Sequence, residues 1–256
     1  MCTFMSNEPR VTIVPGYAGV GVAVHRLGAG PPVVMIHGLA SSAYTNWIRY
    51  GHAAKIAAAG FEAVMLDLRC HGESETPHDP AAYPHDVALL DIEAVLAQLD
   101  LGLIDLVGYS LGARFSVALV SRGLKPGRVV LGGMGYETLT HWAARRDHFL
   151  AMLERFDVSR LGDSDYLSIQ FMKQMNVDPV AVSLLLRSTG DIAPALLDSV
   201  TMPVLVLAGT EDREVGSPKT LADRLPDARH EFVPGNHMSC VTKPELGTAI
   251  AAYLAT

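Results

Sequence analysis

The stretch IDLVGYSLG, residues 104–112, decides the fold of this 256-residue chain. An apolar run with β-branched residues stops at Gly108-Tyr109-Ser110-Leu111-Gly112, and the segment that follows, ARFSVALVSR, has the length and composition of a helix. Glycines two residues before and two after Ser110 predict a turn so sharp that larger side chains would collide there. Free N–H groups at the start of the helix would face negative charge forming beside the serine. The stretch therefore predicts a strand, a tight turn with an exposed serine, and a helix.

A glycine-rich strand-to-helix loop with an incidental serine is the alternative interpretation, because the bare G-x-S-x-G pattern is short enough to recur by chance. A serine hydroxyl becomes a useful nucleophile only if a base takes its proton. The hypothesis of a nucleophile at Ser110 therefore depends on a histidine, an acid and a second N–H donor elsewhere in the chain.

The composition is typical of a globular chain that buries a large core. Hydrophobic residues make up 49% and charged residues 18%, and the length fits one α/β domain with an insertion. The net charge of -7 comes with no basic block, which argues against nucleic-acid binding, and the apolar runs are too short for a membrane span. The first residues, MCTFMSNEPR, have neither a basic nor an apolar leader pattern, so we expect a cytoplasmic location.

The cysteines do not form a pattern that carries chemistry. Cys2, Cys70 and Cys240 are odd in number and lack C-x-x-C spacing, which argues against a disulfide framework or a zinc site. Cys240 follows His237 closely, but no second thiol or matching histidine pair accompanies it. We interpret it as a small buried thiol.

Strand and helix patterns alternate along most of the chain. The expected strands are 11–14, 20–27, 33–38, 61–67, 104–108, 128–135, 203–209 and 229–235, and the expected helices are 47–59, 86–99, 113–122 and 243–254. This alternation predicts a mostly parallel, eight-stranded sheet with helices on both faces, formed by residues 1–135 and 200–256. Residues 136–199 show helical stretches only, near 138–156, 164–175 and 178–187. We expect this block to be a helical cap inserted over the carboxyl ends of the strands, where ligands bind in such sheets.

His237, in VPGNHMSC, is the predicted base, because it follows the last strand on a loop at the carboxyl end of the sheet. His37, in IHGLAS, is interpreted as shaping a loop whose N–H groups face the site, or as a histidine bonded to the backbone. A metal site at His71, His78 and His85 is a further alternative, but these residues lack metal-ligand spacing.

Asp212, in LAGTEDREV, is the predicted acid that holds the histidine tautomer and stabilises its charged form. It directly follows the strand at 203–209, and the chain order Ser110, Asp212, His237 is the one expected for a nucleophile elbow. Glu211, if its turn points it inward, and Glu137, after the strand at 128–133, are the alternative acids.

The oxyanion of a tetrahedral intermediate needs two N–H donors. The predicted donors are the backbone of Leu111, after the nucleophile, and the backbone of Leu39, next to Gly38. Such a site needs neither a metal nor an organic cofactor.

With these segments in place, the chain resembles the α/β-hydrolase superfamily, in its serine-nucleophile, esterase-like branch. The matching segments are HG at 37–38, DLRCHGES at 67–74, GYSLG at 108–112, GTED at 209–212 and GNH at 235–237. Many relatives carry glycine where Cys70 stands. Because the elbow holds Ser110 and not aspartate, the resemblance argues against the dehalogenase and epoxide-hydrolase branches, which form an alkyl-enzyme ester.

The resemblance implies a serine hydrolase that cleaves a carboxylic ester, thioester or lactone through an acyl-enzyme on Ser110. His237 would relay the proton and Asp212 would orient it. A carbon-carbon bond hydrolase or a lyase with the same triad is the main alternative, and a non-catalytic binding protein of this fold is the least favoured. The expected partner is a small-molecule acyl substrate, with no nucleic acid and no membrane; the natural substrate and the oligomeric state stay open.

Overall fold

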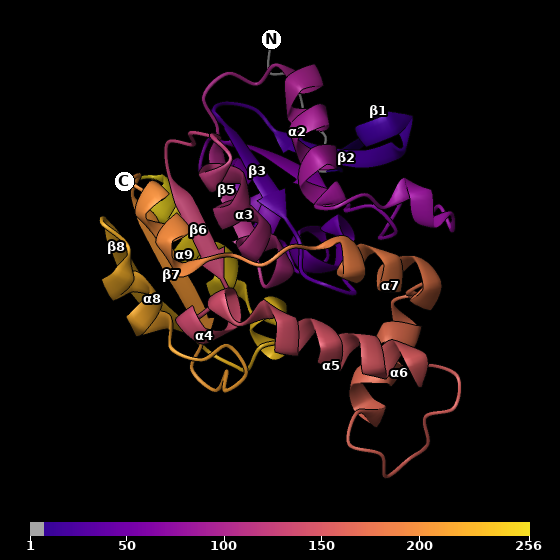
Figure 1. Cartoon of the computed structure of the whole chain (residues 1–256). Helices are drawn as coiled ribbons and strands as arrows, with labels where there is room; N and C mark the ends of the chain where they lie inside the picture. The colour runs from indigo at the N-terminus through magenta and orange to yellow at the C-terminus, as the bar shows by residue number, and fades with distance from the viewer. Residues whose placement is uncertain (1–7) are drawn as a thin grey trace.

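The strands of residues 8–256, the part of the chain that the computed structural model describes, form one sheet in the order β1-β2-β4-β3-β5-β6-β7-β8 (Figure 1). Their bounds are β1 (Arg10–Pro15), β2 (Gly21–Gly28), β3 (Pro32–Ile36), β4 (Glu62–Leu66), β5 (Asp105–Tyr109), β6 (Val129–Gly132), β7 (Val204–Gly209) and β8 (Ala228–Val233). β2 pairs antiparallel with both β1 and β4, and the remaining pairings are parallel. The prediction of a mostly parallel, eight-stranded sheet is confirmed. The expectations for Cys2 and for the start of the chain concern residues outside the described range.

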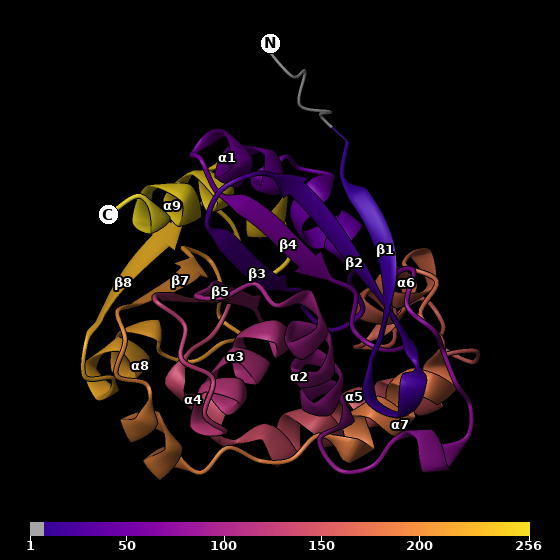
Figure 2. The ribbon, with the colours of Figure 1, turned by 90° about the horizontal axis from the view of Figure 1, so that it is seen from above.

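The central strands are buried on both faces because helices cover each side of the sheet (Figure 2). Helices α1 (His52–Ala58) and α9 (Pro244–Leu254) pack on one face, and α2 (Val87–Leu99) and α3 (Leu111–Ser121) on the other. Successive residues of β3 alternate between the two cores: Val33 and Met35 join the first, Val34 and Ile36 the second. Burial on both faces is the reason that the strands read as unbroken apolar runs.

Three helical segments differ from the sequence prediction. The helix expected at 47–59 is divided into a π-helical segment (Tyr44–Ile48) and α1, because Gly51 between them adopts a left-handed φ of 77°. The helix expected near 138–156 is likewise two helices, α4 (Tyr136–Thr140) and α5 (Trp142–Glu154), which meet at His141. Helix α8 (Pro218–Arg224) was not predicted, although Ser217 before Pro218 is a start signal and its hydroxyl accepts the Thr220 N–H.

Between β6 and β7 the chain is helical, as the sequence indicated. Helices α4 and α5 are followed by α6 (Tyr166–Gln174) and α7 (Pro179–Ser188), and Figure 1 shows α5, α6 and α7 grouped beyond the edge of the sheet. Short 3-10 segments occupy Tyr17–Gly19, Pro80–Ala82, Pro194–Ser199 and Ser239–Thr242. Within residues 8–256 no helix is both long and apolar enough to cross a bilayer.

Candidate active site

Ser110 occupies a strained turn between β5 and α3. Its backbone has a φ of 52° and a ψ of -112°, a conformation that residues other than glycine rarely adopt. A Cβ at Gly108 would lie 2.3 Å from the Gly112 carbonyl oxygen, and a Cβ at Gly112 would lie 2.1 Å from that of Ile36. Both glycines are therefore required by close backbone contacts, which confirms the predicted sharp turn.

The structure brings the three predicted residues of the triad into one hydrogen-bonded chain. His237 Nε2 lies 3.0 Å from Ser110 Oγ, and His237 Nδ1 lies 2.8 Å from Asp212 Oδ2. The side chain of Asp212 is fully buried and that of His237 is 9% exposed. Because an ionised carboxylate only accepts, Nδ1 carries the proton and leaves Nε2 free to accept the serine O–H.

The alternative acids have other contacts. The Glu137 carboxylate accepts the backbone N–H of Ser217 at 2.6 Å and so holds the loop after β7. Glu211 is exposed, and its backbone N–H donates to the carbonyl of Gly235. Asp212 is the acid that contacts His237.

Two unpaired backbone N–H groups lie in the loops beside Ser110. In the described part of the chain, no acceptor is bonded to the N–H of Leu39 or of Leu111, the first residue of α3. Leu39 and Leu111 line the same recess as Ser110, and a Cβ at Gly38 would lie 3.3 Å from the serine Cβ. These N–H groups are therefore placed where an oxyanion on a serine adduct could accept from them.

The amides on either side of Leu39 are bonded to buried side chains. The Gly38 N–H donates to Asn46 Oδ1 and the Ala40 N–H donates to His71 Nε2, both at 3.2 Å. His71 Nδ1 donates in turn to the Arg69 carbonyl at 3.0 Å. Burial lowers the pKa of His71 to about 4, so the neutral ring acts as the acceptor that fixes this loop.

His37 and Asp67 also form hydrogen bonds that hold the loop after β3. His37 Nδ1 donates to the Gly38 carbonyl and its Nε2 accepts the N–H of Leu68, which confirms that it shapes the loop by backbone bonding. Burial lowers the pKa of His37, which keeps it neutral. The Asp67 carboxylate accepts the N–H groups of Ala43 and Glu73, joining the two loops that follow β3 and β4.

The three histidines considered as a metal site have separate partners. His71 bonds within the loop described above, His78 Nε2 lies 2.6 Å from Asp178 Oδ2, and His85 Nδ1 lies 3.3 Å from Asp86 Oδ2. Residues 8–256 contain no group of three His, Cys, Asp or Glu side chains placed to hold a metal ion.

Cys70 and Cys240 are buried free thiols. Cys70 adopts a φ of 58°, the left-handed region that a glycine would occupy easily, so the loop keeps its turn despite the side chain. Cys240 Sγ lies 2.9 Å from the Tyr109 hydroxyl, which also donates to the carbonyl of His237. These contacts support its interpretation as a packed thiol.

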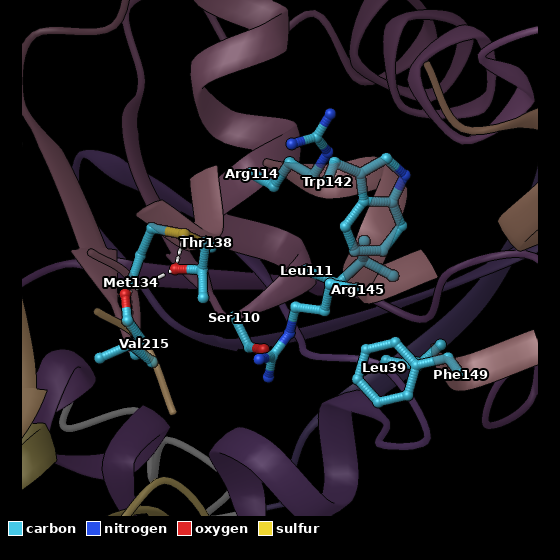
Figure 3. Close-up of a pocket in the computed structure, with 11 residues that line it drawn as sticks. Leu39, Ser110, Leu111, Arg114, Met134, Thr138, Trp142, Arg145, Phe149 and Val215 are labelled. Carbon is cyan, nitrogen blue, oxygen red and sulfur yellow. Dashed lines mark hydrogen bonds between the residues drawn. The ribbon is translucent and has the colours of Figure 1, made fainter. Parts of the chain in front are cut away.

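Ser110 lies where three hollows meet. The largest is an open cavity of about 510 Å³, which we call the main cavity; a narrow recess of about 20 Å³ and a second hollow of about 80 Å³ adjoin it. Helix α5 contributes Arg145 and Phe149 to both the main cavity and the recess, and Figure 3 shows their side chains around Ser110. Residues of the helical block and residues of the flanking segments thus line the same hollows around Ser110.

Comparison with known proteins agrees with the fold. The family described as alpha/beta hydrolase fold matches residues 31–130. An epoxide hydrolase from Caballeronia sordidicola is 36% identical over 37% of this chain and 28% of its own length. The 2-hydroxymuconate semialdehyde hydrolase of Pseudomonas sp. (strain CF600) is 33% identical over 45% of this chain and 40% of its own length. The match thus spans less than half of these curated relatives.

A solved structure extends the likeness to nearly the whole chain. An esterase from Exiguobacterium antarcticum superimposes with a TM-score of 0.78 at 18% identity, covering 96% of this chain and 100% of that one. The chain has the α/β-hydrolase fold, and residues 31–130 match the family described by that name, as the sequence motifs indicated.

The sequence analysis did not predict the roles of three residues at the site. Asn46 and His71 hold the loop of Leu39, and Arg145 places a cation in the main cavity. His71 lies in the DLRCHGES segment, and that position was the one available signal. No local pattern distinguishes Asn46 or Arg145, because their roles depend on contacts with other segments of the chain.

Proposed function

We propose that this protein is a serine hydrolase that cleaves a carboxylic ester through an acyl-enzyme on Ser110. The observation that carries the proposal is the continuous hydrogen-bonded chain from Asp212 through His237 to Ser110. The unpaired N–H groups of Leu39 and Leu111 support it, because acyl transfer develops negative charge on the carbonyl oxygen.

In the proposed reaction, His237 Nε2 takes the hydroxyl proton as Ser110 Oγ attacks the ester carbonyl carbon. The buried Asp212 stabilises the imidazolium that forms, and the two N–H groups hold the oxyanion. Collapse breaks the carbon–oxygen bond, and His237 delivers its proton to the departing alcohol. A water molecule then attacks the acyl-enzyme, gives its proton to His237, and the proton returns to Ser110 as the acid leaves.

Residues 136–199 act as a cap in this proposal, with the remainder as the hydrolase core. The lining of the main cavity supports the division, because it combines Arg145 and Phe149 of α5 and Phe171 of α6 with Ser110 and His237 of the core. We expect the substrate to be a small acyl compound bound between the two parts.

Carbon-carbon bond hydrolysis with the same triad is the second candidate. The similarity to a protein named 2-hydroxymuconate semialdehyde hydrolase favours it over a lyase reaction. The similarity to proteins named epoxide hydrolases carries less weight for the reaction, because a serine at the elbow forms an acyl adduct and not an alkyl ester. We favour ester cleavage of the two candidates, because the triad and the two N–H groups of Leu39 and Leu111 are sufficient for it.

The test compares wild type with Ser110→Ala on 4-nitrophenyl esters of increasing acyl length, and labels both with a fluorophosphonate. We expect Ser110→Ala to lose at least about a thousandfold in kcat/KM and all labelling. Ser121→Ala is the matched control, since this serine lies on the same helix with its hydroxyl bonded to the Ala118 carbonyl. Labelling of Ser110→Ala, or an unchanged rate, would refute the assignment.

A further inference from the structure

Arg145 brings a permanent positive charge into the cavity that holds Ser110. Its side chain, on α5, lines both the main cavity and the recess together with Ser110. In the view of Figure 3 the guanidinium lies over the serine hydroxyl, with Phe149 on one side. A guanidinium stays protonated at any pH at which the fold survives, so the charge is always present.

The hydrogen-bonding capacity of Arg145 is largely unused. Within residues 8–256 its side chain has one hydrogen bond, from Nη1 to the Glu214 carbonyl at 3.2 Å. The Glu214 carboxylate lies 3.8 Å from Nη2, too far for a hydrogen bond, and is itself 66% exposed. A guanidinium has five N–H donors in a planar fork, so most of them are free for a ligand.

The second arginine of the recess is different. Arg114 donates from Nη1 to the Leu139 carbonyl and from Nη2 to the Gly190 carbonyl, both at 2.6 Å. Its guanidinium also stacks on Trp142 at 4.8 Å from the ring centroid. Arg114 therefore connects α3 to the helical block through its hydrogen bonds. Of the two arginines, Arg145 is the one with free N–H donors.

The surroundings of Arg145 favour a strong pairing with an anion. The side chain is 23% exposed, and its guanidinium lies 5.3 Å from the centroid of the Phe149 ring. Phe171 and the buried Met172 line the same cavity, so a charge pair there is screened less than at the open surface, although the Glu214 carboxylate also lines it. Burial lowers the pKa of Arg145, which the negative charges of Glu214 and Asp212 oppose.

The second hollow beside Ser110 has no such charge. Apart from His237, its lining is neutral and includes Thr45, Tyr50 and Val241. A substrate that crosses Ser110 would therefore meet a cation at one end and a neutral surface at the other. This asymmetry can select both a substrate and its orientation.

We propose that Arg145 forms a carboxylate-binding subsite, and that the substrate is an acyl compound that carries a free carboxylate besides the bond to be cleaved. Arginine pairs with a carboxylate through two parallel, charge-assisted N–H donors, whereas the carbonyl of a neutral ester is an uncharged and weaker acceptor and a cation is repelled. The half-ester of a short dicarboxylic acid has this chemistry. The inference rests on the proposed function for the reaction, but the binding of the carboxylate depends on Arg145 alone.

The experiment pairs each half-ester with its neutral diester: 4-nitrophenyl hydrogen adipate against 4-nitrophenyl methyl adipate, with glutarate and suberate pairs to vary the length. We expect wild type to prefer the half-ester at its best length. Arg145→Gln should lower kcat/KM for that half-ester about 10- to 100-fold, mainly through KM, and change the diester by less than about twofold. Arg146→Gln is the matched control, because Arg146 is the next residue of α5 and pairs with Asp147 outside the cavity.

Further variants separate recognition from a structural role. Arg145→Lys keeps the charge and the aliphatic stem, so it should retain part of the preference. Glu214→Gln removes the nearest carboxylate and should strengthen the preference. The proposal would be overturned if Arg145→Gln lost the same factor in kcat/KM on the half-ester and on the diester, or if wild type showed no preference for the half-ester. If Arg145→Gln does not fold, the preferences of wild type and of Glu214→Gln still decide the question.

A binding measurement tests the carboxylate subsite independently of catalysis. Calorimetry of 4-nitrophenyl hydrogen adipate with Ser110→Ala, with and without Arg145→Gln, should show a Kd that rises about 10- to 100-fold on loss of the arginine. If wild type cleaves neither ester, the proposed function fails while this measurement still tests the subsite. Equal Kd values in the two backgrounds would refute the carboxylate subsite.

Discussion

Acidification from pH 7 to pH 5 is expected to destabilise this fold through His71. The ring accepts the Ala40 N–H at Nε2 and donates to the Arg69 carbonyl from Nδ1, so both nitrogens are occupied in the neutral form. Protonation would set an N–H of the ring against the N–H of Ala40. The folded protein therefore resists protonation of His71, and the unfolded chain does not.

The size of the effect follows from the pKa values. Burial lowers the pKa of His71 from 6.5 to about 4. The unfolded chain takes up a proton as pH falls through about 6.5, so the stabilisation is complete above that pH and is lost between there and about 4. One pKa unit corresponds to about 1.36 kcal/mol, so His71 should cost about 2 kcal/mol between pH 7 and pH 5.

Urea unfolding at the two pH values measures this cost. His71→Gln can keep an acceptor near Ala40 but cannot titrate, so wild type should lose about 2 kcal/mol more than this variant between pH 7 and pH 5. His148→Gln is the control, because His148 is an exposed histidine on α5 and its replacement should leave the wild-type pH dependence intact. Equal losses in wild type and His71→Gln would refute the reasoning.

Three substitutions test the remaining geometry. Asp212→Asn presents an amide to His237 Nδ1 and should lower kcat about 10³- to 10⁴-fold with little change in KM; a loss below tenfold in steady-state kinetics would argue against the triad. Gly112→Ala sets a Cβ 2.1 Å from the Ile36 carbonyl oxygen, so urea unfolding should show a loss of more than about 3 kcal/mol. A near-wild-type midpoint would mean that the elbow relaxes. Cys70 has a φ of 58°, and Cys70→Gly should therefore be more stable than Cys70→Ala by about 1 kcal/mol; the reverse order in paired unfolding curves would contradict backbone strain there.

The elements that were predicted well are those whose signals are local. The buried strands read as apolar runs, and the two glycines around Ser110 indicated the turn because each is needed by a close backbone contact. Two of the three helical errors fell where a single backbone conformation divides a helix, at Gly51 and at His141, and the third was the missed α8. In both places the residues on either side retain helical composition, so periodicity alone does not mark the break.

The residues that hold the loop and select the substrate act across the fold. His71 and Asn46 bond to a loop 31 and 8 residues away from them, respectively. Arg145 belongs to a different segment from Ser110 and lies near it only because the fold places α5 beside the cavity that holds Ser110. On a helix that carries both polar and apolar residues, the sequence does not show whether an arginine faces a cavity or solvent.

The sequence by itself determined the order of strands and helices, the sharp turn at Ser110, and the positions of His237 and Asp212 at strand ends. These follow because parallel strands present their carboxyl ends at one edge, so residues there meet whatever their separation in the chain. Only the tertiary structure decided which acid contacts His237, which N–H groups stay unpaired, and which arginine has free donors. Each of these depends on distances between packed segments, which hydrophobic pattern and spacing do not encode.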